Sequence, residues 1–146
     1  MKHYVGVKAV QAERDDRSHD EPGYKVVYPD GYVSWSPKDV FEAAYLPLGD
    51  DPTRVDEATV RQFIGGGGRT QMGNHTVICA ELRNGFTVVE DSACVDPENY
   101  DEALGTRLAL EKVKYQTWAY LGFVLAWARN GLWQPNNPES DERNDD

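Results

Sequence analysis

The clearest hydrophobic pattern in this chain is a pair of short alternating runs on either side of Asn84-Gly85. The runs, His75–Leu82 and Phe86–Val89, predict two antiparallel strands. Asn-Gly between β-branched runs is typical of a two-residue type I′ turn, in which both central residues take a positive φ. A turn of that length places Ile78, Ala80, Leu82 and Val89 on one face. Val77, Phe86 and Val88 lie on the opposite, mixed face. The pattern therefore predicts a β-hairpin with one apolar face.

A longer apolar pattern with helical spacing follows, from about Tyr100 to Asn130. Leucine and aromatic residues recur every three or four positions, and the second half of the segment is apolar on almost every side. Asp101 and Glu102 suit the positive end of the helix dipole. The helix would be roughly 45 Å long, whereas a compact domain of this size has a radius of gyration of about 14–15 Å. We expect either a break at Gly122 into a helical pair or packing of the C-terminal half on another subunit; the apolar surface favours the second and predicts a homo-oligomer.

The first part of the chain has a weaker strand pattern. Tyr4–Val10 alternates well enough for a strand, and the charged stretch Gln11–Pro22 has no periodicity and predicts an exposed loop. Tyr24–Tyr28 and Tyr32–Trp35 flank a Pro-Asp-Gly turn in which Gly31 supplies the left-handed residue. These segments predict a small three-stranded sheet.

Two short helices are expected next. Ser36 suits the N-cap of the first helix, with Asp39 completing a pair that resembles a capping box. Asp56 suits the N-cap of the second helix, Glu57–Ile64. Gly65–Gly68 follows a predicted helix and lacks the lysine of a phosphate loop, so it is interpreted as a flexible linker.

The elements together predict an α+β fold in which small antiparallel β-hairpins precede a long C-terminal helix or helical pair, in an oligomer. Residues 1–48 form a β-rich module with a short helix, and residues 55–133 form the domain of the β-hairpin and the long helix. Residues 134–146 are rich in Asn, Pro, Ser and acidic residues, and we expect this tail to be disordered.

Composition limits the function. The formal net charge of -10, from 25 acidic and 15 basic side chains, argues against binding of DNA or RNA polymers. No run is long enough to span a membrane, and the N-terminus does not resemble a signal peptide. Cys79 and Cys94 lack a CxxC spacing, so we expect reduced thiols in a cytosolic protein.

Catalytic patterns are weak, and we expect no enzyme, no metal and no cofactor. Ser92 has no G-x-S-x-G context, and the three histidines show no spacing that pairs a base with it. Cys94 with His75 as its base is a formal alternative, but a buried, inert thiol is favoured for Cys94. The chain has no Cys/His cluster suited to zinc.

Several motifs resemble a known family. Leu82–Val88, Ser92–Asp101 and Trp118 with Leu121-Gly122 are similar to small tailed-phage proteins of N4-like and Sf-type phages, over about Val55 to Ala126. The leading part, including Gly23–Val26 and Ser34–Pro37, resembles a module found upstream of phage anti-defence domains. The combination resembles the Thoeris anti-defence sponges. This sequence departs from the pattern of the phage family at Glu90-Asp91 and at Lys112-Val113.

The resemblance implies a function in the host cytoplasm, where an oligomer sequesters a cyclic ADP-ribose isomer or a cyclic oligonucleotide without chemistry. A rival hypothesis is a module that binds a host or phage protein through the apolar helix and the acidic tail. A third is a hydrolase of nucleotide signals. The partners expected under the first hypothesis are a small nucleotide-derived ligand and further copies of the chain.

Arg107 is the first candidate contact for such a ligand, because its planar guanidinium suits phosphate and it follows the Ser92–Asn99 turn closely. Ser92 and Asn99 can donate and accept hydrogen bonds at that turn. A solvated Arg107 paired with Asp101 or Glu111 is the structural alternative, and for Ser92 the alternative is capping of the turn.

Four further residues complete the candidate set. Arg69 and Arg83 are additional cations, although Arg83 also suits a solubilising hairpin tip. Trp35 suits stacking on a purine, with burial in the small sheet as its alternative. Asp91 lies beside the turn, where its charge weakens the case for an anion.

Overall fold

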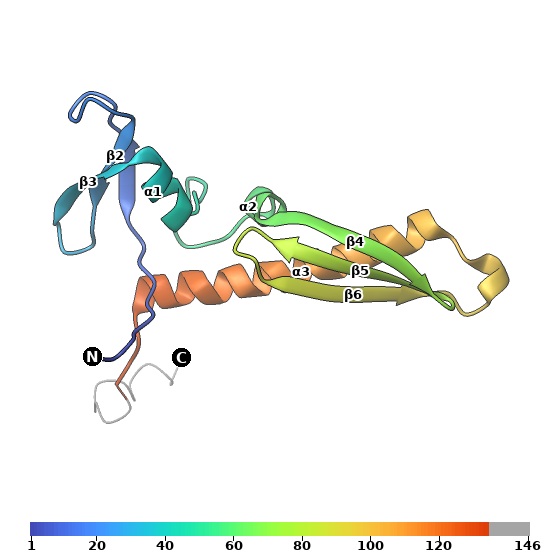
Figure 1. The fold of residues 1–146 in the computed structure, drawn as a ribbon. Coiled ribbons are helices and arrows are strands. Elements are labelled where there is room, and N and C mark those ends of the chain that lie inside the picture. The colour runs from blue at the N-terminus through green and yellow to red at the C-terminus, as the bar shows by residue number, and fades with distance from the viewer. Residues whose placement is uncertain (135–146) are drawn as a thin grey trace. The chain divides into compact units, whose positions relative to one another are not determined.

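The computed structural model describes residues 1–134 of the chain, so the predicted disordered tail lies outside the described residues except for Gln134. The fold is α+β, as predicted, with two three-stranded antiparallel sheets and a long C-terminal helix (Figure 1). The chain divides into two compact units, Met1–Pro47 with the chain from Val124, and Leu48–Phe123. No helix among residues 1–134 is long and apolar enough to cross a membrane.

The sheet of the first unit has the order β1-β2-β3, formed by β1 (Gln11–Arg14), β2 (Gly23–Val27) and β3 (Val33–Pro37). The prediction of a strand at Tyr4–Val10 was wrong, and β1 lies in the segment expected to be a loop. All four residues of β1 are exposed, so they carry no apolar alternation; pairing with β2 makes them a strand. The β2–β3 turn is confirmed, with Gly31 at φ 87°.

Helix α1 (Lys38–Ala44) follows β3 directly. The predicted Ser36 N-cap and its capping-box pair with Asp39 were wrong: Pro37 occupies the cap position, with no side-chain hydrogen bond, and the Ser36 hydroxyl donates to the Pro37 carbonyl. Because β3 continues through Pro37, Ser36 is paired in the sheet and is not free to cap. The helix is held through Phe41, whose ring stacks on Tyr24 with 4.3 Å between centroids.

The sheet of the second unit has the order β4-β5-β6, with β4 (Ile64–Met72), β5 (His75–Leu82) and β6 (Thr87–Ala93). Helix α2 (Glu57–Phe63) precedes it, and its cap is confirmed: Asp56 accepts a hydrogen bond from the Thr59 backbone N–H at 2.8 Å. The flexible linker predicted at Gly65–Gly68 was wrong, because these glycines form the first half of β4. Glycine is required at Gly67, where a Cβ would lie 2.3 Å from the Cys79 carbonyl oxygen.

The β5–β6 hairpin is confirmed, but its predicted two-residue turn was wrong. Within the turn only Gly85 has a positive φ, 85°. Its N–H donates to the Leu82 carbonyl, and the Leu82 N–H donates to the Phe86 carbonyl, which makes a three-residue loop. One extra loop residue exchanges the two faces of the second strand. Val88 is therefore in the core at 3% exposure, and Val89 is 60% exposed.

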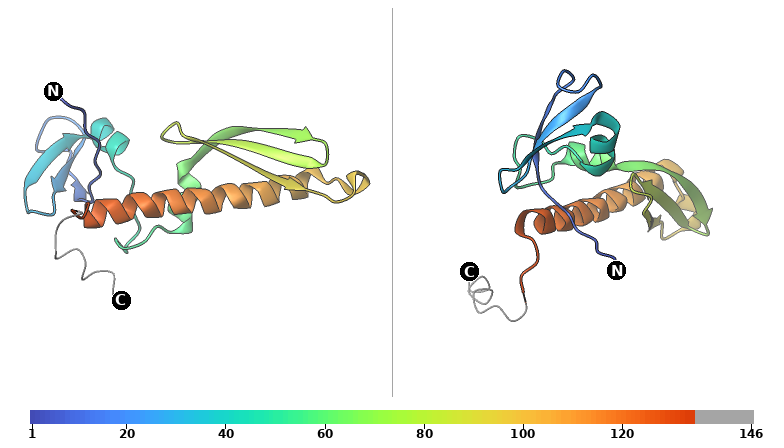
Figure 2. Two further views of the ribbon diagram at one scale, coloured as in Figure 1. Left: turned by 90° about the horizontal axis from the view of Figure 1, so that it is seen from below. Right: turned by 60° about the vertical axis from the view of Figure 1, so that its left-hand side comes forward.

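Helix α3 (Glu102–Asn130) is continuous through Gly122, so of the two alternatives the break into a helical pair does not occur. Figure 2 shows it as one helix from two further directions. It covers the apolar face of the β4–β6 sheet, as predicted (Figure 1). The core of this unit consists of Ile78, Ala80, Leu82 and Val88 from the sheet, with Ala109 and Val113 from α3.

Helix α3 is also tied to α2 and to the residue Val55 shortly before it. The Trp118 indole N–H donates to the Val55 carbonyl at 2.8 Å, and Lys114 pairs with Glu57 at 3.2 Å. A short 3₁₀ helix, η1 (Pro97–Asn99), connects β6 to α3. The N-terminus of α3 is capped by Asp101, which accepts from the Leu104 N–H at 3.0 Å. Helix α3 is thus held within the second unit by the sheet and by the α2 region.

Candidate polar recess at the start of α3

The closest approach of α3 to the sheet is at Gly105. A Cβ at this position would lie 2.2 Å from Thr76 Oγ1 and 3.2 Å from Ser92 Oγ. The Ser92 hydroxyl donates to the Gly105 carbonyl at 2.6 Å, and the Thr76 hydroxyl shares a hydrogen bond of 3.0 Å with the Tyr100 hydroxyl. Both Thr76 and Ser92 are buried. The missing side chain at Gly105 therefore lets hydroxyl groups of β5 and β6 bond directly to the first turns of α3 and the residues before it.

A recess of about 50 Å³ lies beside this contact, between the β4–β5 turn, the end of β6 and the first turns of α3. Its polar side chains come from Asn74, Thr76, Ser92, Asn99, Tyr100 and Asp101. The recess brings Ser92 and Asn99 together, as the sequence predicts. Pockets that bury whole drug-sized ligands are several times larger, about 300–1,000 Å³. Within one chain the recess therefore has room for a hydroxyl or amide edge of a ligand, or for ordered water, but not for a whole nucleotide.

Sequence reasoning missed Thr76 and Tyr100. Thr76 carried a usable signal, because it is two residues before Ile78 in an alternating strand and so shares the buried face. Tyr100 carried none: its contact depends on how η1 turns the chain back over the sheet.

Arg107 is exposed and is not part of the recess wall. It follows Gly105 by two residues, and at 3.6 residues per turn this rotates it about 200° around the helix from the Gly105 contact. No hydrogen bond or ion pair within residues 1–134 joins it to Asp101 or Glu111. Arg107 is thus close to the Ser92–Asn99 turn in sequence. In the structure, however, it lies on a different side of α3 from the Gly105 contact with the sheet.

Arg69 is the arginine tied to the start of α3. It extends from β4 to form an ion pair with Glu102, and its Nη1 donates to the Thr106 hydroxyl at 3.3 Å. Arg83, by contrast, is in the β5–β6 loop at the other end of β5, where its backbone N–H donates to the Phe63 carbonyl. Of the three candidate arginines, Arg69 is the one held by residues that adjoin the recess.

Asp91 pairs with His75 across β5 and β6, with 2.6 Å between Asp91 Oδ2 and His75 Nδ1. This hydrogen bond is the main cause that lowers the pKa of Asp91 below its usual value. Lys112 of α3 donates to the Asp91 backbone carbonyl at 2.6 Å. The two residue pairs that the sequence analysis singled out, Glu90-Asp91 and Lys112-Val113, are therefore in contact with each other in the fold.

The Cys94–His75 pair considered from sequence does not form. His75 is paired with Asp91, and the partly buried Cys94 thiol is 3.6 Å from the Asn74 carbonyl oxygen. Among the described residues no group of His, Cys, Asp and Glu side chains has the arrangement of a metal site. The side chains around the recess offer hydrogen-bonding groups.

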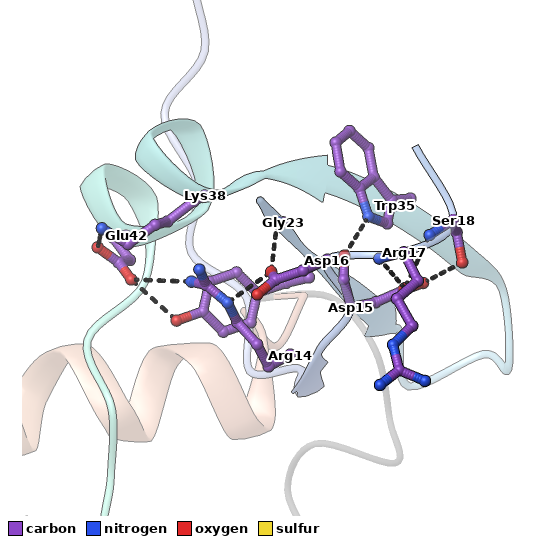
Figure 3. Close-up of polar contacts among 10 residues, drawn as sticks. Arg14, Asp15, Asp16, Arg17, Ser18, Gly23, Trp35, Lys38 and Glu42 are labelled. Carbon is purple, nitrogen blue, oxygen red and sulfur yellow. Dashed lines mark hydrogen bonds and ion pairs between the residues drawn. The ribbon is translucent and has the colours of Figure 1, made fainter. Parts of the chain in front are cut away.

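Trp35 belongs to the first unit. Its indole N–H donates to the Asp15 carbonyl at 3.0 Å (Figure 3), and its ring stacks on His19 with 4.0 Å between centroids. Figure 3 also shows Asp15 and Asp16 bonding to the backbone and side chains around them. Trp35 organises the loop between β1 and β2, so the seven candidate residues do not form one site within a single unit.

The fold thus defines the class of the protein: it is a small α+β protein whose second unit combines a sheet, a long helix and a polar recess. Comparison with known families places it more narrowly: residues 42–128 match the model of the phage protein (N4 Gp49/phage Sf6 gene 66) family. The chain belongs to this family of phage proteins. No curated protein and no solved structure matches it.

Proposed function

We propose that this phage protein acts by binding, without catalysis, and that it sequesters a nucleotide-derived immune signal of the host, such as a cyclic ADP-ribose isomer or a cyclic oligonucleotide. The observation that supports the proposal most is the recess, which gathers two hydroxyls, a phenol and two amides at the turn predicted to contact a ligand. Such groups suit ribose hydroxyls and the polar edges of a base. The host cytoplasm is where such a signal would be met.

The phosphates of this ligand would lie outside the recess, because Asp101 is the charged side chain on its wall and a carboxylate repels phosphate. Arg69 is the best placed cation, since its ion pair with Glu102 is exposed to solvent and can be exchanged for one with a phosphate. The recess holds only part of a nucleotide, so the ligand would also contact the exposed surface around it or a second copy of the chain.

A depletion assay tests this function. The purified protein is incubated with a panel of cyclic ADP-ribose isomers and cyclic oligonucleotides, the protein is removed by filtration, and it is then heated to release what it holds. The proposal expects one member to disappear from the filtrate and to return unaltered on heating. A released product of altered mass would show catalysis, and no depletion of any member would contradict the nucleotide ligand.

Charge reversal tests the site, with Arg83→Glu as the matched control at the far end of β5. We expect Arg69→Glu to weaken binding at least tenfold, because it replaces a charge-assisted contact of about 1.5–3 kcal/mol with repulsion. Arg107→Glu tests the alternative predicted from the sequence. If Arg107 binds the phosphate, this variant should lose more affinity than Arg69→Glu. Equal affinity for all three variants would move the phosphate site away from these arginines.

A second candidate function is binding of a host or phage protein, favoured by the large apolar side chains that α3 leaves exposed in the second unit. They include Leu104, Leu108, Tyr115, Tyr120 and Phe123. Phe86 lies against Tyr120 in an edge-to-face arrangement and extends this surface to the hairpin. Failure of every nucleotide in the depletion assay, together with retention of one defined protein from infected cells, would favour this function.

A further inference from the structure

Strand β4 is an edge strand with an unusual composition. It pairs with β5 on one side only, and within the second unit no strand pairs with its other side (Figure 1). Its residues from Gly65 to Met72 are all exposed, and its first half is Gly65–Gly68. An edge of this kind presents unpaired backbone N–H and C=O groups, and proteins usually protect it with lysine, proline or inward-pointing charges. Strand β4 has neither lysine nor proline; Arg69 is its one charged residue, and its irregularity is confined to the start of the strand, between Ile64 and Gly67.

Three of the four glycines have a reason within the chain and Gly68 does not. A Cβ at Gly65 or Gly67 would approach a β5 carbonyl oxygen to 2.8 Å or 2.3 Å. Gly66 lies at an irregularity of β4, where the pairing register with β5 shifts between Ile64 and Gly67. At Gly68 the ladder is regular, a Cβ would meet nothing within 4 Å, and φ is not positive. Glycine in a strand is destabilising and often marks a bulge or the close approach of another backbone. Gly68 therefore indicates an approach from outside the chain.

We propose that the outer edge of β4 pairs antiparallel with β4 of a second copy, with the two Gly68 residues opposite each other. In this register Arg69 lies opposite Gly67 of the second copy, and Thr70 lies opposite its Gly66. The side chains of one half-strand thus face the glycines of the other. The strand is complementary to itself, as a two-fold interface requires.

The backbone supports the same register. The β4–β5 turn has two residues and Gly73 at φ 62°, so Met72 and His75 close the ladder as a hydrogen-bonded pair. Hydrogen-bonded and non-hydrogen-bonded pairs alternate along an antiparallel ladder, so Arg69 and Gly67 direct their N–H and C=O groups to the outer edge. Pairing about Gly68 brings these two residues opposite each other across the new interface.

Other registers and the other edge fit less well. If the two-fold centre moves by one residue, from Gly68 to Arg69, the two Arg69 side chains lie directly opposite each other, where like charges repel. Strand β6, the second edge of the sheet, carries Glu90 and Asp91, and pairing with itself about Glu90 would oppose carboxylates. The glycine-rich edge of β4 is thus the edge suited to a second copy, whatever ligand the protein holds.

Charge complementation tests the pairing in the full chain. We expect light scattering of the wild type at micromolar concentration to give at least twice the chain mass of 16.4 kDa. Gly68→Lys should halve the mass, because it sets two ammonium groups opposite each other, and Gly68→Glu should do the same. Mixing the two variants should restore the original mass. Thr87→Lys on β6 is the matched control and should leave the mass unchanged, with the circular dichroism of all variants intact.

A cysteine variant tests the register directly. Gly68→Cys in a background with Cys79→Ser and Cys94→Ser should form a covalent dimer on mild oxidation, because residues opposite each other in a non-hydrogen-bonded pair lie at disulfide distance. A wild type that sediments as a monomer would overturn the proposal. An unchanged mass of folded Gly68→Lys would overturn it as well. If the mass falls in Trp127→Glu and not in Gly68→Lys, the interface lies on α3 instead of β4.

Discussion

Substitution of Gly105 by alanine tests whether the contact of α3 with the sheet depends on the absence of a side chain. The new Cβ would lie 2.2 Å from Thr76 Oγ1 and 3.0 Å from Thr76 Cβ. Thr76 is 1% exposed, and its hydroxyl is bonded to Tyr100. A β-branched side chain held in this way cannot rotate aside at low cost. The helix must therefore move away from the sheet, which breaks the 2.6 Å hydrogen bond from Ser92 to the Gly105 carbonyl.

Two opposing effects set the magnitude. Overpacking of a close contact costs about 1–3 kcal/mol, and the tight geometry at Gly105 favours the upper half of that range. Alanine in place of glycine within a helix contributes about 1 kcal/mol in the stabilising direction. We expect Gly105→Ala to lower the free energy of unfolding by about 1–2 kcal/mol. Gly122→Ala is the control on the same helix: its Cβ would meet nothing within 4 Å, so it should raise the free energy of unfolding by about 0.5–1 kcal/mol.

Urea unfolding of the full-length variants measures both effects, with unchanged slopes required for the comparison. A double-mutant cycle adds Thr76→Ala, which removes the obstructing hydroxyl. In that background Gly105→Ala should cost clearly less than in the wild type, because the two residues share one contact. If Gly105→Ala stabilises the protein as much as Gly122→Ala does, the close approach described for α3 is incorrect.

Three further predictions follow from the packing of the second unit. Val88→Ala should lower the free energy of unfolding by about 1.5–3 kcal/mol and Val89→Ala by under about 0.5 kcal/mol; the reverse order in urea unfolding would restore the two-residue turn. Trp118→Phe should cost about 1–3 kcal/mol, since it leaves a carbonyl without its indole donor, and an unchanged midpoint in the same assay would show that this bond contributes nothing. A hydrogen bond from the Thr59 N–H lowers the pKa of Asp56, so its contribution to stability is complete above the usual carboxyl pKa of about 4 and is lost as pH falls through the lowered value. Melting temperatures from neutral to acid pH should fall less steeply in Asp56→Asn, and parallel curves would contradict the cap.

The elements specified by local chemistry could be predicted from the sequence. Asp56 caps α2 because its carboxylate reaches an amide three residues away, and the length of α3 follows from a pattern with no proline in it. Strands β1 and β4 could not be predicted in this way. Exposed polar residues and glycines have no strand preference of their own, so these strands exist because β2 and β5 pair with them.

The turn of the hairpin shows a second limit. Asn84-Gly85 is compatible with a two-residue and with a three-residue loop, since both need a left-handed glycine. The choice depends on which of Val88 and Val89 packs better under α3, and that is a property of the whole core. The faces of β6 were therefore assigned incorrectly, and the strand, predicted as Phe86–Val89 with a turn from Ser92, continues to Ala93.

The candidate site could be predicted only in part, because the sequence brings together residues that are near each other along the chain but not residues that the fold brings together. Ser92 and Asn99 are near each other in sequence, and the structure places both at the recess. Arg107 is equally near in sequence, but its direction depends on the rotation of α3, which is set by the contact at Gly105. Arg69 is 37 residues from its partner Thr106, so only the fold brings it to the start of the helix.

The proposal that the protein holds a nucleotide signal without altering it is tested most directly by native mass spectrometry of the protein after incubation with the cyclic nucleotide panel. We expect a complex whose added mass equals one intact panel member, which is ejected at the same mass when the complex is activated in the gas phase. The bare protein mass with every member of the panel, or an added mass that corresponds to a cleaved nucleotide, would contradict it.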